Sequence, residues 1–373
     1  MGEDNQDTAS TIEIVAAEAD LDYLVKMSKF EGAKSPSFTP PTYTRSDYDR
    51  ELAACDAAVC EAIAVSQKTA SRLVDAHIGY STKVFSQMCG HANSMMRAAP
   101  RSRWVRADFE NWHFSAVAGH ARAIVEGYLL FIYLTDSPAS DAEMRARINV
   151  LHLADCVKRI EFLSETAAAQ DHIDYYIDQR KVIQARLEKN EFFTGLSPTV
   201  RRSCLSGKKM MIRSRDQLLE ATGYEKEQFD ALYDLLSQHT HILTMSFYRM
   251  EPNGRGTGIE NDVDRSYIGV TLKLCAEILE LATARLIGLF PDALFVCNGL
   301  KSKFCPGPAE NMQIKVSVDR TGGKSSRELP SHTTLVLAIH KSLVNAVELT
   351  SKHLCWYYNP ATWYSAMPLL KIR

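Results

Sequence analysis

The stretch FENWHFSAVAGHARAIVEGYLLFIYL, from Phe109 to Leu134, limits the possible fold more than any other part of this sequence. Apolar residues recur in it at steps of three and four, which places them on one helical face: Phe114, Val117, Ala121, Ile124, Val125, Tyr128 and Ile132. The opposite face carries Arg122 and Glu126, and it becomes apolar beyond Gly127. We therefore predict a central helix that runs into the core and brings Arg122 and Glu126 to a partly buried position.

The composition is that of an ordinary soluble protein. Hydrophobic residues make up 46%, charged residues 24%, and the net charge is -2, which disfavours a disordered, collagen-like or wholly basic nucleic-acid-binding chain. The nine cysteines include no C-x-x-C pair, which is typical of reduced thiols and not of a zinc ribbon. The polar, acidic start resembles no signal peptide, and no window reaches ~18 uninterrupted apolar residues. We predict a cytoplasmic protein with no membrane span, metal or cofactor.

Helical periodicity continues along most of the chain. Residues 46–96 favour one long helix or a hairpin, capped by Ser46 or Asp47, and residues 141–190 favour two helices. Further helices are expected at 225–250 and 264–290, whereas residues 312–319 alternate like a strand. The fold class is thus all-α: a tail, short helix and Pro-rich linker at 1–45, a multi-helix bundle at 46–290, and a C-terminal segment at 291–373 with a small extended or β element.

Two basic patches could attract phosphates. In the first, four arginines flank Trp104: Arg97, Arg101, Arg103 and Arg106. We favour a solvated loop whose Trp packs on the core over a base-stacking site. The second is stronger because residues 192–215 contain no acidic residue and accumulate six cations: Arg201, Arg202, Lys208, Lys209, Arg213 and Arg215. Phosphate attraction needs no fixed geometry, so such a segment can hold RNA, DNA or a nucleotide. An unliganded solvated loop is the competing interpretation.

The predicted helix at 225–250 carries the other candidate site. Its expected core face consists of Phe229, Leu232, Tyr233, Leu236, Leu243 and Phe247. Asp234, Ser237 and His241 align on the opposite side at steps of three and four. One helix cannot join all three in a triad, but they can line one cleft, where His241 could act as a general acid or base. The alternative is a helix packed on both sides, whose polar groups bond to one another or to a neighbouring helix.

Two short motifs carry a family resemblance. Ala121-Arg-Ala-Ile-Val-Glu126 and Tyr233-Asp-Leu-Leu-Ser-Gln-His-Thr-His241 resemble a family of uncharacterised bacterial helical proteins that have an Arg-x-x-x-Glu helix and a later Tyr-x-x-Leu-Ser-x-x-x-His helix. That family is similar to the HEPN superfamily (higher eukaryote and prokaryote nucleotide-binding), many members of which are metal-independent ribonucleases of toxin–antitoxin and phage-defence systems. The resemblance covers mainly residues 109–250.

The resemblance implies roles for specific residues. In the ribonucleases, a His transfers protons and an Arg on the same helix stabilises the phosphate. His241 matches that His, but Asp234 stands where the Arg is expected, so Arg122 on the other helix would have to supply the cation. Glu126 could instead neutralise Arg122 in an ion pair one turn away.

These observations leave three classes of function open. The first is a HEPN-like protein that recognises RNA or a nucleotide, as a ribonuclease-like component of a bacterial defence or toxin system. The second is a non-catalytic interaction protein in which Arg122, Glu126, Ser237 and His241 form a structural polar network. The third is a small-molecule enzyme that uses the same pocket. The aromatic C-terminus, from Trp356 to Tyr364, could pack on the body or form contacts with a homodimer or another protein.

Overall fold

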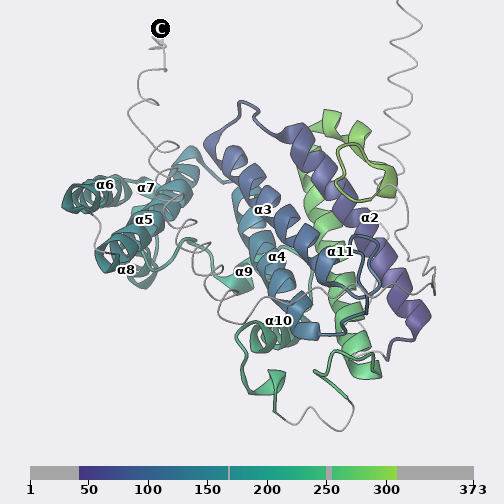
Figure 1. The fold of residues 1–373 in the computed structure, drawn as a ribbon. Coiled ribbons are helices and arrows are strands. Elements are labelled where there is room, and N and C mark those ends of the chain that lie inside the picture. The colour runs from purple at the N-terminus through teal and green to yellow at the C-terminus, as the bar shows by residue number, and fades with distance from the viewer. Residues whose placement is uncertain (1–41, 167–168, 249–253, 309–373) are drawn as a thin grey trace, which may run out of the picture. The chain divides into compact units, whose positions relative to one another are not determined.

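A computed structural model describes residues 42–166, 169–248 and 254–308, and it confirms the mostly helical bundle (Figure 1). No strand forms in these three ranges, where the only β pairing is an isolated antiparallel bridge between Trp112 and Gly258. The expected N-terminal helix, the strand at 312–319 and the aromatic C-terminus lie outside the described residues.

Four long helices lie side by side and enclose most of the main core (Figure 1): α2 (Arg45–Thr69), α3 (Ala76–Ala98), α4 (Phe114–Thr135) and α11 (Asp262–Leu289). Residues 46–96 therefore form the hairpin and not a single rod. The predicted cap was wrong, because Thr44 is the N-cap of α2. Its side chain accepts from the Asp47 amide, and the Asp47 carboxylate accepts from the Thr44 amide in return, so two open amides of the first turn are satisfied.

The central helix forms as α4, but it begins at Phe114 and not at Phe109. Both of its faces are buried in the second half, as the sequence indicates, and α3 approaches closely there. A Cβ added to Gly127 would lie only 2.7 Å from Cγ of Met88, so the helix pair needs a glycine at this position. By length and hydropathy α4 could also cross a membrane, but 61% of that window is buried inside the protein, as in the core helix of a soluble fold.

A second, smaller core joins α5 (Asp141–Glu165), α6 (Gln170–Glu188), α7 (Glu191–Thr194) and α8 (Pro198–Leu205). The two helices predicted for 141–190 are thus confirmed as α5 and α6. Arg147 links this unit to α4, because its buried guanidinium pairs with Glu143 and donates to the carbonyl oxygens of Tyr133 and Asp136 at 3.1 and 3.0 Å.

The remaining elements are α9 (Arg215–Glu220), α10 (Lys226–Thr240) and the 3-10 turns η1 (Thr244–Ser246), η3 (Pro291–Val296) and η4 (Gly299–Lys301). α10 packs against α4 but ends ten residues short of the predicted limit near 250. Ile242 adopts a left-handed conformation with φ 53°, and the Leu243 amide donates to the Gln238 carbonyl at 2.9 Å, which closes the helix. Leu243 and Phe247 are consequently 44% and 57% exposed, so their assignment to the core was wrong.

Candidate functional site

The structure brings together the two motifs of the sequence on neighbouring helices. Arg122 of α4 donates from Nε to Oγ of Ser237 on α10 at 2.9 Å, and Ser237 Oγ donates to the Tyr233 carbonyl at 2.7 Å. Each motif places its pair of residues one helical turn apart, so the two pairs can meet where the helices touch. We call Arg122, Glu126, Tyr233 and Ser237 the Arg122 cluster.

Arg122 is neutralised inside this cluster. Its Nη1 lies 2.5 Å from Oε1 of Glu126, and the Tyr233 hydroxyl donates to the same oxygen at 3.1 Å. The guanidinium carbon lies 3.5 Å from the centroid of the Tyr233 ring, which is within the range of a cation–π contact. Burial and the charge of Glu126 raise the pKa of Tyr233, so its hydroxyl stays protonated and able to donate. The cation therefore already has a carboxylate, a hydroxyl and an aromatic ring as partners.

His241 and Asp234, the other two predicted members of the site, do not join the Arg122 cluster. Both are exposed, and neither side chain forms a hydrogen bond or ion pair with the described part of the chain. His241 lies just past the end of α10, where its backbone amide donates to the Ser237 carbonyl at 3.0 Å. Because the helix ends there, the expected alignment of Asp234, Ser237 and His241 along one continuous stripe is not formed.

The histidine that does pack between the helices is His239, which the sequence reasoning missed. It is 2% exposed, its Nδ1 lies 2.9 Å from Oγ of Ser115, and its ring meets that of Phe114 edge-on at 4.5 Å between centroids. Residue 239 falls three positions after Leu236, on the face already assigned to the core, so the helical period could have identified it.

Burial also sets the charge of His239. Desolvation is the largest cause, and together with the positive charge of Arg255 it lowers the pKa of His239 to about 4. His113 lowers this pKa slightly further, whereas the negative charge of Asp264 raises it in part. The ring is therefore neutral at neutral pH. Its Nε2 is buried and has no hydrogen-bond partner within the described residues.

Two arginines of the first basic patch, Arg101 and Arg103, have structural partners. Arg101 forms a forked pair with Asp49 at 2.8 and 3.1 Å, and Arg103 forms another with Asp56 at 2.5 and 2.9 Å. Trp104 is 3% exposed and donates from Nε1 to Asp56 at 2.8 Å. The prediction that this Trp packs on the core is confirmed, and the two arginines are occupied by carboxylates.

The second patch divides into paired and unpaired cations. Arg213 pairs with Asp136, and Arg215 lies 2.7 Å from Asp230 and 4.6 Å from the centroid of the Tyr233 ring. The other four cations have no carboxylate partner in the ranges that the structure describes, and we call them the α8 basic surface: Arg201, Arg202, Lys208 and Lys209. Only this part of the predicted patch is open to a bound anion.

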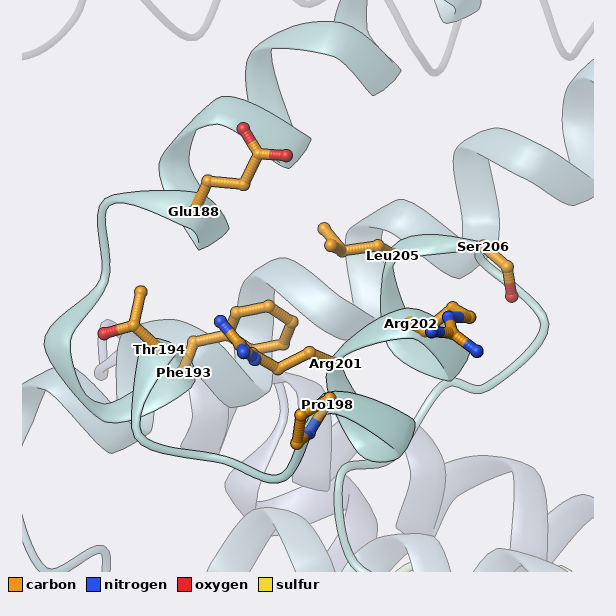
Figure 2. A pocket seen from close by; sticks show the side chains of 8 residues that line it. All are labelled: Glu188, Phe193, Thr194, Pro198, Arg201, Arg202, Leu205 and Ser206. Carbon is orange, nitrogen blue, oxygen red and sulfur yellow. The ribbon is translucent and has the colours of Figure 1, made fainter.

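A cavity of about 690 Å³ adjoins this surface (Figure 2). It is lined by Glu188 of α6, by Phe193 and Thr194 of α7, and by residues of α8 and its end: Pro198, Arg201, Arg202, Leu205 and Ser206. No cluster of three or more His, Cys, Asp or Glu side chains suited to a metal ion occurs in the described parts of the chain.

Comparison with known proteins adds a family without an assigned role. Residues 95–256 match a family model described as a family of unknown function, DUF5677. The matched stretch contains the Arg122 cluster, His239 and the α8 basic surface. No curated protein and no solved structure matches the chain.

Proposed function

We propose that the protein binds RNA through the α8 basic surface. The observation that carries this proposal is the contrast among neighbouring arginines: Arg213 and Arg215 contact carboxylates, whereas Arg201 and Arg202 contact none among the described residues. Unpaired cations on one surface attract a polyanion such as an RNA backbone. The attraction is local, because the net charge of the whole chain is only -2.

The Arg122 cluster has a structural role in this proposal. A catalytic Arg must offer donors to a phosphate, but Arg122 already contacts Glu126, Tyr233 and Ser237. The resemblance to HEPN proteins supports RNA as the polyanion, and a bacterial defence or toxin system as the setting. We propose recognition of RNA without cleavage by this chain alone. A cytoplasmic location and a homodimer or protein partner remain predictions.

Salt-dependent RNA binding tests the first part. We expect single-stranded RNA to bind the full chain with an affinity that falls as the salt concentration rises. A plot of the logarithm of the association constant against the logarithm of the salt concentration should have a slope of about -0.7 for each phosphate contacted. The double variant Arg201→Glu with Arg202→Glu should abolish binding. The matched control is Lys158→Glu with Lys181→Glu, which makes the same change in net charge at exposed lysines of α5 and α6. Equal loss of binding in both double variants would refute the α8 surface.

Incubation of RNA without metal ions tests the second part. We expect total RNA to remain intact with wild-type protein and with the His241→Ala variant, since His241 contacts no neighbouring cation in the described structure. Cleavage by the wild type that is lost in His241→Ala and in Arg122→Ala would instead establish a ribonuclease and refute the structural role of the cluster.

A further inference from the structure

The cavity beside α8 differs from the rest of the basic surface because it is concave and contains a buried guanidinium nitrogen. Arg201 and Arg202 are neighbours in sequence but extend in different directions. In Figure 2, Arg201 reaches across the cavity toward Phe193 and Thr194. Arg202 extends away from Arg201, on the side of Ser206. The charge of Arg201 therefore lies inside the cavity, whereas that of Arg202 lies toward Ser206.

Arg201 carries an unsatisfied donor. Its Nε is buried and has no hydrogen-bond partner within the described residues. Leaving a buried charged donor unpaired costs free energy, so native proteins rarely leave one without water or a ligand. The guanidinium lies near Phe193, which is 1% exposed and therefore part of the fixed wall of the cavity. The guanidinium thus stands at the wall of the cavity with a positive charge that no carboxylate among the described residues neutralises.

We propose that this cavity binds the phosphate monoester at the end of an RNA strand, an inference that rests on the proposed RNA binding. A volume of about 690 Å³ is in the range of small-ligand pockets and can hold one nucleotide. A monoester carries more negative charge than a backbone diester and offers three oxygens to a guanidinium fork. An open surface would bind internal phosphates equally well, whereas a recess selects the position where the chain ends.

Glu188 strengthens the selection for an end. Glu188, in the last turn of α6, lines the cavity at its rim, and in Figure 2 its carboxylate extends away from Arg201. A carboxylate repels a second phosphate but accepts hydrogen bonds from ribose hydroxyls. A negative charge at the rim therefore disfavours a second phosphate beside the one that Arg201 would bind, and a strand end brings only one.

Calorimetric titration of the full chain with RNA oligonucleotides that differ only in their end groups tests the proposal. The probes are one RNA sequence with a 5′-phosphate, with a 5′-hydroxyl and with a 3′-phosphate, together with uridine monophosphate and inorganic phosphate alone. We expect a phosphorylated end to bind roughly tenfold more tightly than the hydroxyl form, the effect of one charge-assisted hydrogen bond. Arg201→Gln should remove this preference. Lys209→Gln, the control, removes a charge of the α8 basic surface outside the cavity, so it should weaken both forms equally and keep the preference, and circular dichroism checks that both variants fold.

The outcomes separate this proposal from the one on which it rests. Equal, salt-sensitive binding of all RNA forms would overturn the end-selective cavity and leave RNA binding by α8 standing. No binding of any RNA would overturn both. A preference that survives in Arg201→Gln would overturn the assignment to this cavity. Tight binding of uridine monophosphate with no discrimination between the RNA ends would identify a free nucleotide as the ligand and would also overturn the strand-end assignment.

Discussion

Acidification should destabilise the protein through His239. Its pKa in the folded state is about 4, against 6.5 for an ordinary histidine, because the ring is buried between α4 and α10. The unfolded chain therefore binds a proton on this side chain more readily than the folded chain does. The stabilising contribution is fully present above pH 6.5 and is lost as the pH falls toward about 4.

The size of the effect follows from the two pKa values. At about 1.4 kcal/mol for each pH unit, the interval from 6.5 to about 4 corresponds to about 3.5 kcal/mol of unfolding free energy, of which about 3 kcal/mol is lost by pH 4. The charged groups around the ring also favour a lowered pKa. Arg255 in the loop before α11 and His113 before α4 oppose a second positive charge, and Asp264 of α11 offsets them only in part.

Urea denaturation followed by circular dichroism across this pH interval measures the effect. His239→Phe keeps a ring against Phe114 but cannot titrate, so it should lose about 3 kcal/mol less stability than the wild type on acidification. Burial also lowers the pKa of His152 and His120, so only the difference between the two proteins isolates His239. His172→Gln, at an exposed position, is the control and should behave like the wild type. An acid response in His239→Phe equal to that of the wild type would refute the reasoning.

Three further predictions follow from single side chains. Arg122→Met should cost about 1–3 kcal/mol of stability in urea and leave RNA affinity unchanged, and the reverse pattern would contradict a structural role. Arg147→Ala should cost about 3 kcal/mol, because the buried carboxylate of Glu143 loses its main partner and keeps only Arg213 at 3.7 Å and the Ala139 amide, and a lowered urea midpoint will show it. Gly207→Ala should lower the thermal midpoint more than Gly223→Ala. Both glycines have positive φ, costing about 1–2 kcal/mol for Ala, but only at Gly207 would a Cβ meet a side chain, at 2.3 Å. Equal losses would exclude the steric contribution.

The helical period predicted the fold well because burial enforces it along each element. α4, α5, α6 and α11 all follow apolar residues at steps of three and four, and their ends agree with the sequence within a few residues, apart from the start of α4. The error at α10 has a local cause. The apolar run continues through Leu243 and Phe247, but a left-handed residue at 242 stops the helix and turns that run to the surface.

Whether each arginine has a carboxylate partner could not be predicted in the same way. Arg103 pairs with Asp56, which is 47 positions away, and Arg101 pairs with Asp49, which is 52 positions away. No local pattern contains such partners, because the packing of α2 beside the loop that follows α3 creates them. The same reason explains why the six cations of residues 192–215 looked equivalent in sequence, although packing leaves only those of the α8 basic surface without carboxylates among the described residues.

The Arg122 cluster shows why the two motifs fit both a catalytic and a structural interpretation. Arg-x-x-x-Glu and Tyr-x-x-x-Ser each place two polar side chains one turn apart, and any pair of helices that bury such residues must bring donors to acceptors. The spacing therefore specifies the contact but not its purpose. What distinguishes the two roles is whether the cation is already neutralised, and Arg122 is paired with the Glu126 carboxylate and contacts Ser237 and the Tyr233 ring. Arg201 on α8 differs from Arg122 because it lines a cavity and has no carboxylate partner among the described residues, which leaves its charge available to an anionic ligand.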